Sequence, residues 1–379
     1  MSRKQTRRHF FNQTSAASLG LLSVPALASG TFKHPAGEPV WKNWKEGMQY
    51  RPLGRTGMMV SEIVLGTFSF TTEDSFDVFD ESIARGVNYI DCAAAYAQGK
   101  AETNLGNYLK KSGNGDKIFL ATKLSGYYGM VNQLIGKEIK KRPSAFKKDL
   151  EARAQELIKS RNVKRPGYYI QYFGAQAKQF DKAYYQYAAL EELGMPEEWR
   201  EKIKQHAGGL LKESMEHLQA EHIDVLHIPH GVAMPEMMDN LIKEIFADFK
   251  NRGVISASAV SFHNDVTGNL LGAQKVGYYD AAMFAYNIAN HAGLEHAMWK
   301  ANQSGMGLIA MKVAKLFSMN NQPTWRLAKL NALVPHDNLS PFAKSYLWAL
   351  QNQNLSCCVS QMETIEQLRD NLQVIGKKV

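Results

Sequence analysis

Eight short apolar runs recur between residues 62 and 361, and most of them are separated by stretches whose composition suits a helix. Such runs, rich in β-branched and other apolar residues, are typical of strands buried on both faces of a sheet. Eight strand–helix units in a chain of this length predict one α/β domain with a closed (β/α)8 barrel. The runs are EIVLGTF, VNYID, KIFLATK, HIDVLHI, VISASAV, YDAAMFAY, MGLIAMK and LSCCVSQ.

A long segment, residues 126–208, lies between the third predicted strand and the helix that leads into the fourth. Within it, residues 141–160 and 175–193 repeat Leu, Phe or Tyr at helical spacing, which predicts two amphipathic helices. Loops after barrel strands lie over the active site, so we expect a helical insertion after strand 3 that acts as a lid. Its tyrosines either stack on sugar rings or pack against the barrel, and we favour packing. They are Tyr127, Tyr128, Tyr168, Tyr169 and Tyr172.

Three polar side chains lie at or near the ends of two neighbouring predicted strands. Asp91 ends the run VNYID, Tyr96 follows five residues later in a loop, and Lys123 ends the run KIFLATK. Parallel strands joined by a helix have their carboxyl ends at the same edge of the sheet. We therefore expect Asp91, Tyr96 and Lys123 to lie close together, at the edge where barrel enzymes place their active sites.

These three residue types suit proton transfer. A phenol titrates near pH ~10 and is a poor acid at neutral pH. An ammonium group beside Tyr96 lowers the pKa of the phenol, and the Asp91 carboxylate can anchor that lysine. The phenol then donates a proton to a carbonyl oxygen that gains negative charge when hydride arrives from a nicotinamide. The alternative is a surface network of three common residues without catalytic function.

Several segments resemble the aldo-keto reductases over most of residues 49–375. They are RPLGRTGMMVSEIVLGTFSF, ARGVNYIDCAAAYAQGKAETNLG, IFLATK, GMGLIAMK and QMETIEQLRDNL. The resemblance implies a TIM barrel with an N-terminal β-hairpin and NAD(P)H-dependent reduction of an aldehyde, ketone or sugar carbonyl, or oxidation of the alcohol. In that family, the residues at the positions of Asp91, Tyr96 and Lys123 carry the proton-transfer roles.

The family usually has a fourth catalytic residue, a His at the end of the fourth strand, five positions after an Asp. Here the fifth position after Asp224 is Pro229, and the candidates are His227 and His230. His227 has the expected side-chain direction but lies deeper, where a core histidine is the default. We favour His230, because a bend at Pro229 turns it into the site. Strand alternation separates His227 from His222 and His230, so no metal site is expected.

The positions that hold the cofactor carboxamide depart from the family pattern. The family usually places Ser-Asn after strand five and Gln on strand six, and this chain has Ser261, Phe262 and Met283 there. The Tyr that normally stacks on the nicotinamide falls at Met311. The fold is unaffected by these changes, but nucleotide affinity depends on them.

At the last strand–helix unit, an Arg often pairs with the adenosine 2′-phosphate, and this chain has Glu363 there. A carboxylate repels that phosphate and can accept a hydrogen bond from a ribose hydroxyl, which favours NADH over NADPH. NADP(H) or NAD(H) is the expected cofactor. The resemblance implies that the cofactor-binding residues are Ser261, Lys312, Glu363, Gln367 and Asn371.

Residues 1–28 have the features of an export signal. Four basic residues precede a modest apolar run, and residues 26–28 (ALA) match a small-x-small cleavage site. The pair Arg7 and Arg8 resembles a twin-arginine signal. We expect a periplasmic or extracellular protein that meets export machinery, with a mobile arm over residues 29–48. The alternative is an amphipathic N-terminal helix of the folded domain.

Removal of residues 1–28 takes away four positive charges, so the net charge falls from +9 to +5. The remaining basic residues are too scattered to indicate nucleic-acid binding. No later stretch approaches ~20 uninterrupted apolar residues, so no membrane span is expected. Because free NADPH is not supplied outside the cytoplasm, export would favour a tightly retained nucleotide.

Two further functions stay open. The first is a barrel that binds a ligand or partner without catalysis, which the missing carboxamide ligands favour. The second is a redox-neutral epimerase or isomerase that acts through a trapped nucleotide. For the enzyme, the expected partner is a small-molecule carbonyl or sugar substrate, and specificity depends on loops whose shapes the sequence does not reveal.

Overall fold

The structure is a computed structural model that describes residues 38–163, 165, 168–231, 235–237, 240–320 and 323–379. Eight strands, all paired in parallel, close into a barrel in the order β10-β11-β4-β5-β6-β7-β8-β9. Each of the eight predicted runs overlaps one of these strands, so the predicted (β/α)8 barrel is confirmed. The strands are β4 (Ile63–Gly66), β5 (Tyr89–Asp91), β6 (Phe119–Lys123), β7 (Ile223–Gly231), β8 (Ile255–Phe262), β9 (Ala281–Ala285), β10 (Gly307–Met311) and β11 (Cys357–Gln361).

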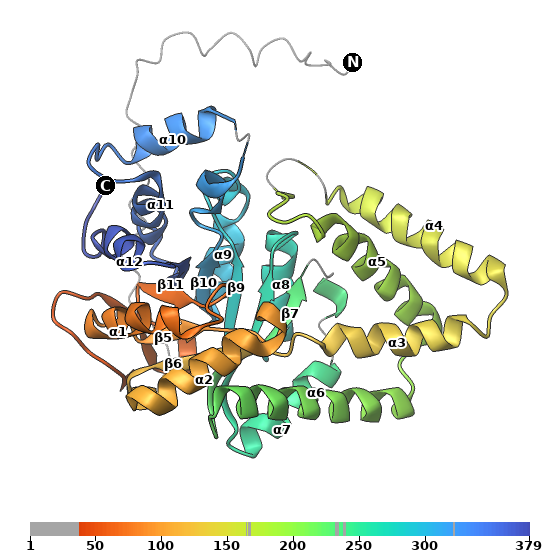
Figure 1. Cartoon of the computed structure of the whole chain (residues 1–379). Helices are drawn as coiled ribbons and strands as arrows, with labels where there is room; N and C mark the ends of the chain where they lie inside the picture. Colours follow the sequence, from red (N-terminus) through yellow and green to blue (C-terminus); the bar gives the residue numbers. More distant parts are fainter. Residues whose placement is uncertain (1–37, 164, 166–167, 232–234, 238–239, 321–322) are drawn as a thin grey trace, which may run out of the picture. The chain divides into compact units, whose positions relative to one another are not determined.

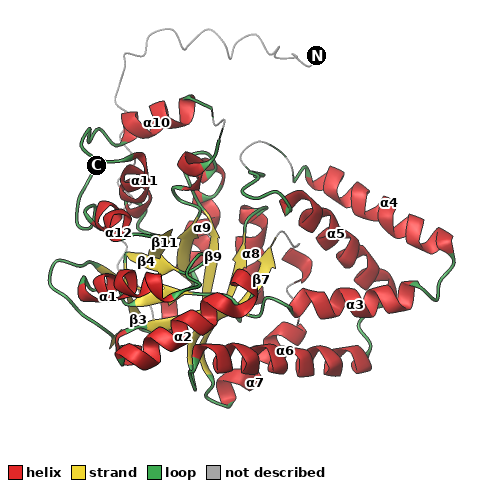
Figure 2. Cartoon of the chain, in the orientation of Figure 1, coloured by secondary structure: helices red, strands yellow, loops and turns green. Residues whose placement is uncertain are grey.

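Helices surround the barrel (Figures 1 and 2). One apolar cluster fills the barrel interior, with Val64, Tyr89 and Phe119 among its members, and a larger one lies between strands and helices. Both faces of the strands are therefore buried, which explains why the sequence shows continuous apolar runs rather than alternation. The helices outside the insertion are α1 (Phe76–Ala84), α2 (Lys100–Ser112), α7 (Asn240–Asn251), α8 (Val266–Val276), α9 (Glu295–Gln303), α10 (Trp325–Leu333), α11 (Pro341–Leu350) and α12 (Ile365–Leu372).

A small sheet precedes the barrel. The predicted hairpin consists of β2 (Tyr50–Pro52) and β3 (Met58–Ser61), and β1 (Val40–Trp41) pairs with the other edge of β3. Part of the segment predicted as a mobile arm is thus paired in the structure. Lys42 Nζ also lies 3.1 Å from Asp224 Oδ1, at the amino end of β7, and 2.8 Å from the carbonyl oxygen of Ile118. These contacts tie the residues before β2 to the barrel.

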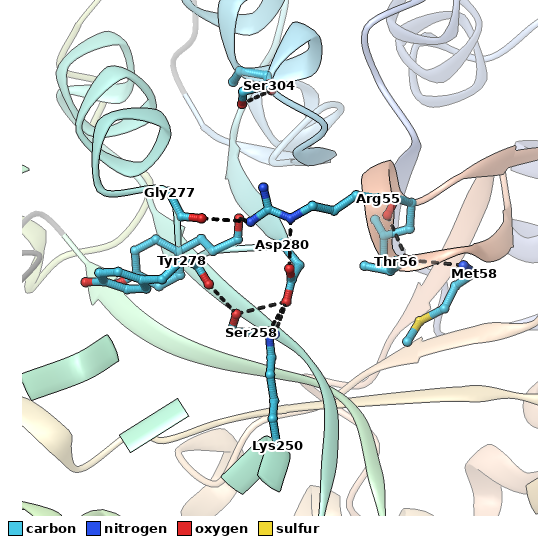
Figure 3. Close-up of polar contacts among 12 residues, drawn as sticks. Arg55, Thr56, Met58, Lys250, Ser258, Gly277, Tyr278, Asp280 and Ser304 are labelled. Carbon is cyan, nitrogen blue, oxygen red and sulfur yellow. Dashed lines mark hydrogen bonds and ion pairs between the residues drawn. The ribbon is translucent and has the colours of Figure 1, made fainter. Parts of the chain in front are cut away.

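A charged cluster around Asp280 lies at the amino ends of the strands, just before β9 (Figure 3). Arg55 Nε donates to Asp280 Oδ1 at 3.0 Å, and Arg55 Nη2 donates to two carbonyl oxygens, of Gly277 and Tyr279. Lys250 Nζ and the Ser258 hydroxyl both donate to Asp280 Oδ2. We call this set the base cluster. It joins the turn before β3 to α7, β8 and β9, which is a structural role.

The insertion after β6 forms four helices, which lie together on one side of the barrel in Figure 1. The two stretches predicted as amphipathic helices coincide closely with α4 (Ser144–Arg161) and α5 (Gln176–Leu193). The sequence reading did not anticipate α3 (Tyr127–Ile139), and α6 (Glu197–Leu218) leads into β7. Among the described residues, none of the helices has the length and hydropathy that a membrane crossing requires.

Candidate active site

Asp91, Tyr96 and Lys123 meet at the carboxyl end of the barrel, as the sequence predicts. Asp91 is the last residue of β5, Lys123 is the last residue of β6, and Tyr96 begins the short turn before α2. Lys123 Nζ donates to both carboxylate oxygens of Asp91 at 2.7 Å and to the Cys92 carbonyl oxygen at 2.6 Å. The Tyr96 hydroxyl lies 3.4 Å from the same Nζ. We call these three side chains the triad.

The ion pair in the triad is almost completely buried, because Asp91 is 2% exposed and Lys123 is 6% exposed. Burial acts to lower the pKa of Lys123, but the neighbouring Asp91 and Tyr96 outweigh it and raise that pKa well above its ordinary value. Burial raises the pKa of Asp91, and the ammonium group of Lys123 opposes this rise. Lys123 is therefore a permanent positive charge beside Tyr96 at neutral pH.

The pKa of Tyr96 corrects one expectation. We expected Lys123 to lower it below the ordinary value of a phenol, and the structure has it raised instead. Burial is the largest cause, and the attraction of Lys123 only partly offsets it. Tyr96 is consequently protonated at neutral pH, as a proton donor must be. The ammonium group of Lys123 is thus placed to stabilise a Tyr96 phenolate once one forms, and it does not produce one beforehand.

Of the two histidine candidates, only the side chain of His227 belongs to the described part of the chain. His227 pairs in register with Lys123, is fully buried and lies with Nε2 3.5 Å from the Tyr89 hydroxyl. Burial, helped by the charge of Lys123, lowers the pKa of His227 far below its ordinary value, so this ring is a neutral core histidine. The side chain of His230 lies outside the described part of the chain, and its catalytic role stays a prediction. The β7–β8 register shifts between Pro229 and Gly231, which fits the expected bend.

An aromatic side chain that the sequence reading passed over lies beside the triad. Phe68, in the loop after β4, is 65% exposed, and its ring meets that of Tyr96 edge-on with 5.2 Å between centroids. Gln361, at the end of β11, fixes this loop by accepting from the Phe68 amide and donating to the Ser69 hydroxyl. Other aromatic side chains of the chain are exposed as well, but the contact of Phe68 with Tyr96 places an apolar surface directly beside the triad.

The predicted carboxamide positions are apolar in the structure, apart from Ser261. Ser261 is buried on β8 and pairs in register with Met283 of β9, whose side chain is in the barrel interior. Met311 is also buried in that interior. Just after β8, however, two buried polar atoms have no hydrogen-bond partner, His263 Nδ1 and Asn264 Nδ2. The residues present can thus still bind a polar group such as a carboxamide.

Lys312 lies directly after β10, in the left-handed region with φ of 60°. Burial lowers the pKa of its ammonium group to about 8, and the nearby charges of Lys315 and Lys123 act in the same direction. Asp91 acts on Lys312 in the opposite direction. Lys312 therefore lies close enough to the triad to interact with it, as expected for a residue that contacts cofactor or substrate.

The predicted adenosine-binding residues gather at the amino end of α12. The backbone N–H of Glu363 donates to Gln367 Oε1. The backbone N–H of Gln367 donates to the Thr364 hydroxyl, which caps the helix. Asn371 is buried, donates to the Ser360 hydroxyl and has an unpartnered Oδ1. The exposed Glu363 side chain and the free acceptor of Asn371 fit an adenosine with ribose hydroxyls.

Among the described residues, no three His, Cys, Asp or Glu side chains gather closely enough to hold a metal ion.

The aldo/keto reductase family model matches residues 62–378, which is most of the chain. The chain belongs to the aldo/keto reductase family. Members of this family are oxidoreductases and are typically NAD(P)H-dependent.

Individual relatives match over shorter stretches. Protein tas of Escherichia coli (strain K12) is 36% identical over 90 residues, which cover 21% of this chain and 26% of that protein. The uncharacterized oxidoreductase YrpG of Bacillus subtilis (strain 168) is 35% identical over 86 residues, or 20% of this chain and 26% of YrpG. The chain thus spans about a quarter of the length of these curated relatives. Their activities are therefore not assigned to it.

The fold is also similar to that of solved structures. Aldo-keto reductase AKR11C1 from Bacillus halodurans, in its holo form, superposes with a TM-score of 0.57 over 87% of this chain and 92% of its own. Sequence identity is 20%, so this likeness concerns the fold alone.

Proposed function

We propose that the protein is a NAD(P)H-dependent oxidoreductase that reduces an aldehyde, ketone or sugar carbonyl, or oxidises the corresponding alcohol. The observation that carries the proposal is the placement of Lys123 Nζ, which is bonded to both Asp91 oxygens and lies 3.4 Å from the Tyr96 hydroxyl. A buried, permanently charged ammonium beside a protonated phenol is the arrangement that general-acid catalysis of carbonyl reduction needs.

When bound, a nicotinamide nucleotide supplies hydride to the carbonyl carbon. Tyr96 donates its proton to the carbonyl oxygen as negative charge develops there. Lys123 stabilises the phenolate that remains, and Asp91 keeps Lys123 in place. Oxidation of an alcohol uses the same groups in reverse, with the phenolate of Tyr96 accepting the proton. The substrate rests beside Phe68, which bounds the site on the β4 side.

The first test combines nucleotide binding with Tyr96→Phe. We expect the wild type to bind NADH or NADPH, and the variant to bind it with unchanged affinity while turnover of aldehydes and ketones falls about 10²–10⁴-fold. Tryptophan fluorescence measures binding, and nicotinamide absorbance measures turnover. Full activity of Tyr96→Phe would refute the assignment. A wild type that binds neither nucleotide would favour the non-catalytic barrel, for which the apolar Phe262 and Met283 are the supporting observation.

Cofactor preference gives a second test, because the exposed carboxylate of Glu363 disfavours a 2′-phosphate. We expect the wild type to bind NADH more tightly than NADPH, and Glu363→Arg to shift the ratio of the two dissociation constants toward NADPH by about tenfold or more. Glu366→Arg, on the first turn of α12, controls for a general change in charge. Equal ratios in wild type and Glu363→Arg would remove Glu363 from the site.

We also propose that the protein is exported with a tightly retained nucleotide. The support is the order of features in residues 1–28, which lie outside the described residues. Replacing both Arg7 and Arg8 by Lys is expected to leave the protein in the cytoplasm, as cell fractionation would reveal. Export of that variant at the wild-type level would argue against a twin-arginine route. Rapid exchange of bound nucleotide in the purified mature enzyme would argue against retention.

A further inference from the structure

One stretch of the insertion is hydrogen-bonded to the loops that follow two barrel strands, β8 and β9. Residues 168–176, here called the strap, connect the α4 region to α5. The Tyr172 hydroxyl accepts a hydrogen bond from Asn287 Nδ2 at 2.8 Å, just after β9. Gln176 Nε2 donates to Asn264 Oδ1 at 2.8 Å, just after β8. Asn287 also approaches the Lys312 carbonyl oxygen after β10, with its Nδ2 at 3.5 Å.

The strap is packed onto the barrel rather than laid over it loosely. Gln176, Asn264 and Asn287 have no exposed surface, and Tyr172 is 6% exposed. Tyr172 contributes to an apolar cluster with Ala285, Ile288 and Leu316. The strap therefore covers the mouth of the barrel above β8, β9 and β10, on the side where Ser261 and Lys312 lie.

His263 lies directly beneath the strap. Its ring meets the Phe173 ring edge-on, with 5.3 Å between centroids, and the Tyr172 ring lies 6.2 Å away. Burial lowers the pKa of His263 to about 3, and the positive charges of Lys312 and Lys123 contribute. At neutral pH the imidazole is uncharged, so one ring nitrogen donates and the other accepts.

Two polar atoms beneath the strap lack partners, and they are complementary in kind. Asn264 Nδ2 is an amide nitrogen that can only donate. His263 Nδ1 accepts when the proton is on Nε2. Buried polar groups are nearly always hydrogen-bonded, so an unpartnered donor and acceptor on consecutive residues indicate a ligand that supplies both partners. A primary carboxamide does so, with one carbonyl oxygen and one NH2 group.

We propose that His263 and Asn264 bind the carboxamide of the nicotinamide, in place of the amide side chains that the chain lacks at Phe262 and Met283. The proposal rests on the proposed function. The Phe173 and Tyr172 rings cover His263, so the strap must shift to admit the nucleotide and then closes over it. Such a closure predicts that the nucleotide dissociates slowly.

The experiment compares nucleotides that differ only in the carboxamide. The probes are NAD⁺ or NADP⁺, whichever binds more tightly, the corresponding 3-acetylpyridine analogue, which keeps the carbonyl oxygen but lacks the NH2 group, and ADP-ribose with the matching 2′ substituent. Calorimetry gives each dissociation constant for wild type and His263→Ala. We expect the wild type to bind the carboxamide about tenfold more tightly than the analogue, as one buried hydrogen bond provides. We expect His263→Ala to bind the two about equally.

Two variants serve as controls. His263→Asn keeps a hydrogen-bonding side chain and is expected to restore most of the discrimination. His296→Ala, at an exposed histidine on α9, is expected to behave as wild type. ADP-ribose affinity should be the same in all four proteins, which separates loss of the carboxamide contact from misfolding.

The outcomes are distinct. Discrimination that vanishes in His263→Ala, with unchanged ADP-ribose affinity, supports the proposal. Discrimination that persists in His263→Ala, or is absent from the wild type, overturns it and leaves the proposed function intact. A wild type that binds neither the nucleotides nor ADP-ribose overturns the proposed function, and this proposal with it.

Discussion

The base cluster and the triad lie at opposite ends of the barrel. Both combine a carboxylate with a lysine, but the two clusters have different roles. In the base cluster, the Asp280 carboxylate accepts from two cationic side chains and a serine. In the triad, one ammonium group, that of Lys123, is shared by a carboxylate, a backbone carbonyl and a phenol. Asp280 has an excess of donors, whereas Lys123 has one acidic partner and one group that can exchange a proton.

The electrostatic consequences are opposite. Burial acts to raise the pKa of Asp280, but its donors outweigh this and lower it, so the carboxylate is secured as an anion. The pKa of Tyr96 is raised because burial outweighs the single lysine. The abundant donors therefore keep the Asp280 carboxylate charged, whereas burial keeps the Tyr96 phenol protonated. Barrel enzymes show this division between a stabilising amino-terminal face and a reactive carboxyl-terminal face.

The largest contrast is expected when the same substitution is made in each lysine. Lys123→Met leaves Asp91 buried without a counter-charge, so the free energy of unfolding should fall by about 3–5 kcal/mol and activity should disappear. Lys250→Met, in the partly exposed base cluster, should cost less than about 1 kcal/mol and leave kcat unchanged. Urea denaturation and steady-state kinetics measure both. Equal costs in unfolding free energy would show that the two clusters do not differ as argued.

A second comparison removes the carboxylate charge of the base cluster. Asp280→Asn weakens the bonds from Arg55, Lys250 and Ser258, and we expect a loss of about 1–3 kcal/mol in unfolding free energy. Nucleotide affinity and kcat should be unchanged, because the cluster lies at the amino ends of the strands. A large fall in kcat with normal stability would mean that the two ends of the barrel are coupled.

The pH dependence of stability provides a finer test. Because the pKa of Asp280 is lowered on folding, its contribution is fully present above the pKa of an unfolded Asp and is lost as pH falls through the lower, folded value. Stability of the wild type should thus decline on acidification more steeply than that of Asp280→Asn. Parallel curves from denaturant melts across the acidic range would exclude this contribution.

The smallest expected change in stability comes from Tyr96→Phe. The Tyr96 side chain is partly exposed, and its polar contact in the triad is the 3.4 Å approach of Lys123, so the free energy of unfolding should change by about 0.5 kcal/mol or less. Combined with the large loss of turnover expected for this variant, the result would separate catalysis from folding in the triad. A cost above about 2 kcal/mol would assign Tyr96 a structural role instead.

Some of the site was predictable because it depends on local pattern. Asp91 and Lys123 end apolar runs, and the parallel arrangement of a barrel brings such ends together. The sequence did not single out His263 and Asn264, although they lie two and three residues after Ser261, because the family pattern has its amides at the positions of Phe262 and Met283. Asn264 contacts the distant Gln176, His263 contacts the distant Phe173, and no local pattern reveals these contacts or which buried atoms are left without a partner.

The sequence by itself determined the barrel, the position of the insertion and the edge at which the reactive side chains gather. These follow from hydrophobic periodicity and strand order, which are properties of neighbouring residues. Only the tertiary structure decided that the pKa of Tyr96 is raised and that the strap covers His263. Burial and long-range contacts sum over residues far apart in the chain, and the balance between desolvation and a nearby charge exists only once they are packed.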